Sequence, residues 1–89
     1  MLHRRCYLPA SLAEFCAVPS TVTVQAETGT QVLTQLASEF PSLQVALGDD
    51  ARVLPNFLMM FCAQEQVTDL ERTLMPDADI TILMPHVGG

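Results

Sequence analysis

One segment of the chain, residues 30–40, has the spacing of an amphipathic helix, and all strand-like segments lie before or after it. Thr30 is expected to cap this helix, and Pro41 ends it because proline cannot continue the helical hydrogen bonding. Its apolar stripe consists of Val32, Leu33, Leu36, Ala37 and Phe40. A chain of 89 residues with one main helix must therefore bury one face of a sheet beneath that helix.

Two predicted strands precede the helix. Residues 3–9 alternate loosely and residues 20–26 alternate cleanly between apolar and polar side chains. We expect these strands to pair in an antiparallel manner through a wide hairpin. Residues 11–15 of the connection can form one helical turn, because Ser11 followed by Glu14 has the spacing of a capping box.

A long connection and two further strands follow the helix. Residues 41–55 are expected to be the connection, and residues 56–62 and 79–84 have the composition of strands. Three apolar residues of the connection can pack beneath it: Leu43, Val45 and Leu47. Between the two strands we expect a turn, a short edge piece and a helical turn, at residues 63–66, 67–68 and 69–74.

The strand at residues 56–62 is apolar on both faces. Such a strand is either central in a doubly covered sheet or has one face reserved for a partner. Because one helix covers only one face, the second explanation is favoured. We therefore predict an α+β fold of the β-grasp type, with a mixed sheet of four to five strands and one main helix. Residues 1–84 would form this domain, and residues 85–89 a flexible C-terminal tail.

The predicted tail ends in Gly88 and Gly89, after Pro85 has terminated the last strand. Without Cβ atoms, two glycines form a slim thread that can enter a narrow channel. Such a thread would present the carboxylate of Gly89 to the ATP of another enzyme. A frayed chain end explains the same residues equally well, so other segments must decide.

The charge balance excludes several classes of partner. The net charge is −6, and the chain has four arginines and no lysine, so a basic surface for nucleic acid is excluded. No apolar run approaches about 20 residues, which argues against a membrane span. No apolar stretch with a cleavage site follows Arg4 and Arg5, so we predict no signal peptide and a cytoplasmic protein.

The cysteines and histidines do not form a recognisable site. The spacings of Cys6, Cys16 and Cys62 fit neither a redox motif nor a zinc motif, and small buried hydrophobic side chains explain them better. His3 and His86 lie near opposite ends of the sequence. We therefore predict no metal site.

Four stretches, in order along nearly the whole chain, resemble a known family. They are the first strand and bend at 7–14, the helix ending in Phe40-Pro41, the strand at 57–62, and the strand and tail at 79–89. Together they resemble the ubiquitin-like sulfur carriers, the small subunit of molybdopterin synthase (MoaD) and the thiamine carrier ThiS, and the former more closely. The departures are Ala63-Gln64 in place of Asn-Gly, Met84 in place of Pro and Val87 in place of Ala. They leave the subfamily and its pathway open.

The resemblance implies a chemistry at the tail. An E1-like adenylyltransferase of the MoeB or ThiF type would adenylate Gly89 with ATP, and sulfur would then displace AMP to leave a thiocarboxylate next to Gly88. A synthase, MoaE-like or other, would accept the sulfur. The chain itself would be a carrier with no bound cofactor and no active site of its own. The sequence leaves open whether a longer precursor is trimmed to end at Gly89.

The resemblance also assigns the faces of the strand at 57–62. Leu58, Met60 and Cys62 would face the helix, and the alternate residues would lie on the uncovered face. The partner-binding residues that it implies are Phe57, Met59, Phe61, Pro85, His86 and Val87. Alternatively, residues 42–55 or a second copy of the chain could cover this face, and we expect a monomer or a weak dimer.

Two other functions remain open from the sequence. The chain could be a ubiquitin-like protein modifier that is joined through Gly89 to lysines of target proteins. It could also be a β-grasp interaction module in which the glycine end is incidental. The first alternative needs the same thread-like end as a sulfur carrier, so the sequence pattern does not separate them.

Overall fold

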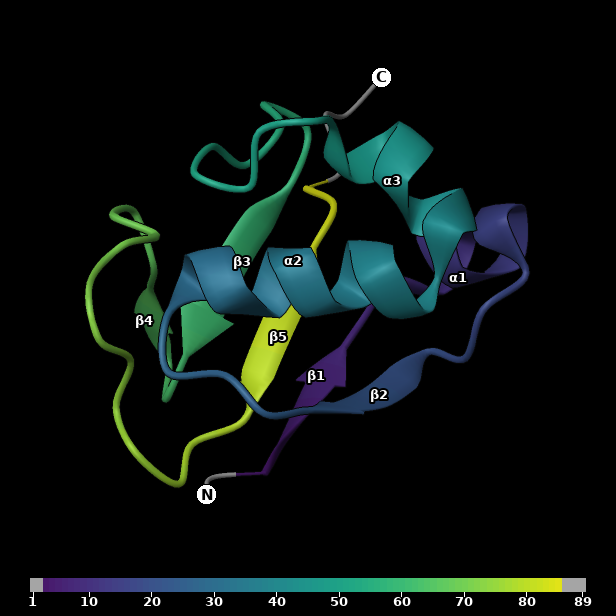
Figure 1. Cartoon of the computed structure of the whole chain (residues 1–89). Helices are drawn as coiled ribbons and strands as arrows, with labels where there is room; N and C mark the ends of the chain where they lie inside the picture. The colour runs from purple at the N-terminus through teal and green to yellow at the C-terminus, as the bar shows by residue number, and fades with distance from the viewer. Residues whose placement is uncertain (1–2, 86–89) are drawn as a thin grey trace.

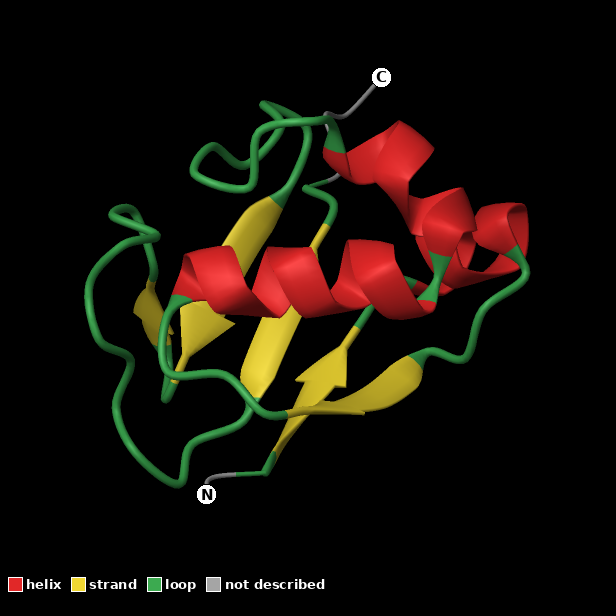
Figure 2. Ribbon diagram, viewed as in Figure 1, coloured by secondary structure: helices red, strands yellow, loops and turns green. Residues whose placement is uncertain are grey.

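The computed structural model describes residues 3–85, which form one mixed sheet and three helices (Figures 1 and 2). The strands are β1 (Arg4–Tyr7), β2 (Thr21–Val24), β3 (Met59–Cys62), β4 (Glu65–Gln66) and β5 (Ile80–Leu83). The helices are α1 (Ala10–Cys16), α2 (Gly29–Glu39) and α3 (Pro41–Leu47).

The sheet has the strand order β2-β1-β5-β3-β4. Strands β1 and β2 form the predicted antiparallel pair, and β5 lies in the centre, parallel to β1 and antiparallel to β3. Helix α2 crosses one face of the sheet (Figure 1). This arrangement confirms the β-grasp fold that the sequence predicts.

The cap of helix α2 lies two residues before the predicted cap. Thr28, not Thr30, is the cap residue, and its side chain accepts a hydrogen bond from the Gln31 amide at 3.1 Å. Gly29 is therefore the first helical residue. A Cβ atom at Gly29 would lie 3.2 Å from the Cα atom of Leu70, so this close approach of two backbone segments requires glycine.

The prediction that residues 41–55 are an irregular connection is wrong for their first half. Residues 41–47 form α3, which has Pro41 in its first turn, where proline is well tolerated. Leu43 and Leu47 are buried one turn apart, whereas Val45 between them is 86% exposed. Leu43 and Leu47 have the four-residue spacing of a buried helix face, which the apolar Val45 between them made hard to recognise in the sequence. The main helix α2 is therefore packed against a second helix, α3.

Helix α1 forms where a helical turn is expected, but the predicted capping box is wrong. Its cap is Pro9, which has no side-chain hydrogen bond to offer, so Ser11 lies inside the helix. The helix ends at Ala17, which has a left-handed backbone with φ of 58°. Burial of Leu12 and Cys16 on the core side therefore stabilises this helix more than its cap does.

The hairpin between β3 and β4 turns through Ala63 and Gln64. Both have positive φ, 53° and 71°, as the first-choice two-residue hairpin turn requires, although neither is glycine. The edge strand is β4, at residues 65–66, two residues before the predicted piece at 67–68. Residues 69–74 form no helix; instead Leu70 and Leu74 are buried against the core.

The core lies between the sheet and the helices. Its most enclosed side chains, each under 2% exposed, include Leu36, Leu43, Met60, Ile80 and Ile82. At one end of the core, buried Arg4 donates from Nη1 to the carbonyls of Met75 and Ala78, at 2.9 and 3.0 Å. These two bonds tie the segment before β5 to β1.

Candidate functional site

The two faces of β3 differ as predicted. Leu58, Met60 and Cys62 point into the core and are at most 5% exposed. Phe57, just before the strand, is 48% exposed, and Met59 and Phe61 are half-buried on the opposite face. A strand that is apolar on both sides thus has one face covered by helices and one face open.

Strand register gathers further apolar side chains on the open face. Met59 pairs with Leu83, and Phe61 pairs with Thr81, which pairs in turn with Tyr7. We call this set the outer patch: Tyr7, Phe57, Met59, Phe61 and Leu83. Tyr7 and Leu83 were not assigned to this face from the sequence. Each follows a buried strand residue, Cys6 or Ile82, and adjacent strand residues point to opposite faces.

The charged residues Arg5 and Asp79 lie on the same face, next to Tyr7 and away from Leu83. The Arg5 amide donates to Asp79 Oδ1 at 3.0 Å, and the Arg5 guanidinium lies 3.5 Å from the Tyr7 hydroxyl. The hydrogen bond to Tyr7, with the negative charge of Asp79, raises the pKa of Arg5. The face is therefore polar near the start of β5 and apolar near its end.

The chain leaves the sheet beside the outer patch. Leu83, Met84 and Pro85 are exposed at the end of β5, and Ser11 Oγ of α1 lies 3.9 Å from Met84 Sδ. Pro85, one of the predicted partner-binding residues, is exposed and directly follows Met84 in the chain. The other predicted residues of the tail, His86, Val87, Gly88 and Gly89, lie outside the described residues.

Residues 42–47 cover the inner face of the sheet, not the outer patch. Leu43 and Leu47 join the core, and α3 packs against α2. The alternative that residues 42–55 cover the open face is therefore wrong for residues 42–47. The outer patch is an apolar surface of the kind that proteins use for contact with a partner.

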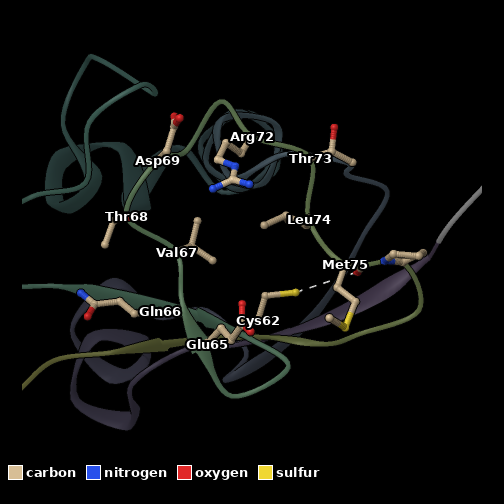
Figure 3. A pocket seen from close by; sticks show the side chains of 11 residues that line it. Cys62, Glu65, Gln66, Val67, Thr68, Asp69, Arg72, Thr73, Leu74 and Met75 are labelled. Atoms are coloured by element: carbon tan, nitrogen blue, oxygen red, sulfur yellow. Dashed lines mark hydrogen bonds between the residues drawn. The ribbon is translucent and has the colours of Figure 1, made fainter.

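A cavity of about 450 Å³ lies at the other end of the sheet. It is formed by β4 and the segment 65–76, with the Arg72 guanidinium pointing inward above Val67 and Leu74 (Figure 3). Cys62 forms part of its floor and pairs with Ile80, the first residue of β5, which places the cavity away from the chain's exit. The sequence contained no signal for this cavity.

The described part of the chain contains no cluster of three or more histidine, cysteine or acidic side chains arranged to hold a metal ion. Complete burial raises the pKa of the Cys6 thiol to about 12, as expected for a cysteine that serves as a core side chain. Over residues 3–85, no helix has the length and apolar character needed to cross a bilayer.

No protein-family model matches the chain, and no curated protein matches it either. Solved structures do match. Small archaeal modifier protein 1 from Haloferax volcanii superimposes with a TM-score of 0.78 at 22% identity, over 98% of this chain and 99% of that one. The protein of the same name from Methanosarcina acetivorans gives 0.76 at 24% identity, over 100% and 98%.

A third match is the crystal structure of the Amycolatopsis orientalis BexX/CysO complex, with a TM-score of 0.77 at 19% identity, over 96% of this chain and 98% of that one. The three matches span almost the whole of both chains. At these identities they establish a common fold, the ubiquitin-like β-grasp.

Proposed function

We propose that this protein is a ubiquitin-like sulfur carrier whose reactive group is the carboxylate of Gly89. In this proposal the chain is a protein co-substrate, not an enzyme. An E1-like adenylyltransferase binds it, consumes ATP, and leaves a thiocarboxylate at Gly89.

One observation carries the proposal: β5 in the middle of a ubiquitin-like sheet leads directly into exposed Met84 and Pro85 beside the outer patch. A partner that docks on the open face through Phe57, Met59 and Phe61 would find the chain's exit at the edge of its contact. His86 and Val87 would then continue into that partner, and Gly88 and Gly89, which lack side chains, would pass through the narrowest part of its channel.

The chemistry needs no catalytic group in the carrier. The Gly89 carboxylate attacks the α-phosphate of ATP, releasing pyrophosphate and forming a mixed anhydride with AMP. Hydrosulfide then attacks the acyl carbon, the C–O bond to AMP breaks, and the thiocarboxylate remains. If a persulfide is the donor, a thiol must afterwards cleave the acyl disulfide that forms.

The thiocarboxylate sulfur is a soft anionic nucleophile, so it can attack an electrophilic carbon of a precursor held by a synthase and form a thioester. Water then cleaves the acyl C–S bond, which leaves the sulfur on the product and returns the carboxylate of Gly89. Resemblance to MoaD favours a MoaE-like acceptor and molybdopterin as the product, and a related sulfur-containing metabolite would require the same chemistry. The carrier ends the cycle with its carboxylate restored and its fold unchanged.

A second candidate is conjugation to proteins, which the likeness to the small archaeal modifier proteins favours. The first step is shared, since both routes activate Gly89 as an adenylate. They differ in the nucleophile that follows, which is sulfide for a carrier and a target lysine for a modifier.

Intact mass spectrometry tests the proposal. The chain is incubated with a MoeB- or ThiF-type enzyme, ATP and sulfide, and a carrier gains the mass difference between one sulfur and one oxygen atom. A variant lacking Gly88 and Gly89 must show no gain. Thiol-resistant conjugates with lysine-containing proteins would instead support the modifier, and no change of any kind with wild-type chain would overturn both.

A further inference from the structure

Phe15 of α1 is 83% exposed, more than any aromatic side chain of the outer patch. It is not needed for the core, because α1 buries its other side through Leu12, Ala13 and Cys16. An aromatic ring held in water on a short helix gives nothing to folding. Aromatic residues, phenylalanine included, are enriched in protein–protein interfaces relative to the rest of the surface.

The position of Phe15 relates it to the chain's exit. Ser11 and Phe15 are four residues apart in α1, so they lie on the same side of the helix, about 6 Å apart along its axis. Ser11 Oγ is the group that contacts Met84 Sδ, at 3.9 Å. Phe15 therefore stands one helical turn away from the exit of the chain, on the α1 side of it.

The short tail forces any enzyme that reaches Gly89 to come close. Residues 86–89, even fully extended, span at most about 14 Å. The rim of the enzyme's channel must then lie close to the end of β5 on all sides. Leu83, paired with Met59, borders the exit on the open face of the sheet, and Ser11 borders it on the side of α1, one helical turn from Phe15.

Charge defines what the enzyme must present to α1. Glu14 beside Phe15 is exposed, and α1 carries no basic residue. None of the four arginines offsets this charge: Arg4 is buried, Arg5 lies beside Asp79, Arg52 pairs with Asp50 at 3.1 Å, and Arg72 lines the remote cavity. The matching surface is an apolar socket with a lysine or arginine next to it.

We propose that Phe15 is a second anchor for the activating enzyme, which holds the chain's exit between Phe15 on α1 and the outer patch on the sheet. This inference rests on the proposed function, because it names a contact of the same adenylation complex. It adds a residue that lies on neither the sheet nor the tail. The partner surface is an apolar socket flanked by positive charge.

ATP–pyrophosphate exchange with a MoeB- or ThiF-type enzyme tests the anchor. Phe15→Ser is expected to raise the KM for the carrier about tenfold and to leave kcat unchanged, as for a residue that contributes to docking but not to chemistry. Met75→Ser is the matched control, because Met75 is also exposed, at 54%, but lies with Arg4 and the cavity away from the exit.

Photocrosslinking gives a second readout that does not depend on turnover. With p-benzoylphenylalanine in place of Phe15, the carrier should crosslink to the activating enzyme, and with the same group in place of Met75 it should not. Equal KM values for Phe15→Ser and Met75→Ser, or equal crosslinking at both positions, would overturn the anchor while leaving the carrier function intact. Failure of the wild-type chain to be adenylated would overturn both.

Discussion

The two faces of the central sheet are built from the same strands but have different surroundings. On the inner face, Met60, Ile80 and Ile82 are almost completely buried beneath α2 and α3. On the outer face, Met59, Phe61 and Leu83 come from the same two strands and remain partly in solvent. Apolar residues therefore serve stability on one face and are available for recognition on the other.

The comparison teaches that apolar character alone does not identify a core. Burial on the inner face contributes roughly 25 cal/mol for each Å² of apolar surface that leaves water. The same surface on the outer face can contribute only when a partner covers it. The difference between the faces is set by which elements cover them. Two predictions test this difference, and a third tests the hairpin that joins β3 to β4.

The largest expected effect compares adjacent residues of β5 that point to opposite faces. Ile82→Ala should lower the free energy of unfolding by about 3 kcal/mol, because Ile82 is 1% exposed and its loss leaves a cavity. Leu83→Ala should cost less than about 1 kcal/mol, because Leu83 is 45% exposed. Urea unfolding measures both, and similar losses would mean that the outer face is part of the core.

A smaller effect, on function, is expected for a charge placed in the outer patch. Phe61→Asp should leave the fold intact and raise the KM for the carrier in adenylation about tenfold, because a carboxylate would be desolvated in the contact. The measurement is ATP–pyrophosphate exchange, with circular dichroism to check the fold.

Thr23→Asp is the control for that charge. Thr23 is exposed on β2, opposite Arg5, and therefore lies on the same face but away from the outer patch. Unchanged loading of Phe61→Asp, or an equal change for both variants, would show that the outer patch is not where the enzyme binds.

The smallest expected effect concerns the hairpin that connects β3 to the edge of the sheet. Replacing Ala63 and Gln64 by Asn-Gly should raise the free energy of unfolding by about 1 kcal/mol, because both positions have positive φ. Adenylation should be unaffected, since the turn belongs to neither face.

Thermal or urea unfolding measures the gain at the turn, and Gln66→Gly in β4 is the control. Gln66 lies in a strand, so glycine there should lower stability by about 0.5 to 1 kcal/mol. No gain from Asn-Gly would argue that the left-handed backbone at Ala63 and Gln64 is not a strained feature.

Several parts of the fold could be predicted because they depend on local pattern. The alternation in β2 and β5, the helical stripe of α2 and the opposite directions of Met59 and Met60 follow from periods of two and about four. The β-grasp fold then follows from the order of these elements. The outer patch was half predicted, through Phe57, Met59 and Phe61.

Other parts failed because neighbours distant in sequence decided them. The spacing of Leu43, Val45 and Leu47 fits either a strand or a helix, and packing of Leu43 and Leu47 into the core selected the helix. Thr28 rather than Thr30 caps α2 because Gly29 packs against Leu70, more than 40 residues away. Tyr7 joined the outer patch only through the register of β1 with β5.

The linear order of residues was enough to specify strands β2 and β5 and helix α2, which side chains are apolar, and where Gly88 and Gly89 lie. These properties are local, because they depend on backbone period and side-chain chemistry. Only tertiary structure decided that residues 41–47 form a helix, that Tyr7 and Leu83 join the open face, and that Phe15 lies one helical turn from the exit of the chain. These features depend on which distant segments lie close together, and that is set only when strands pair and helices pack.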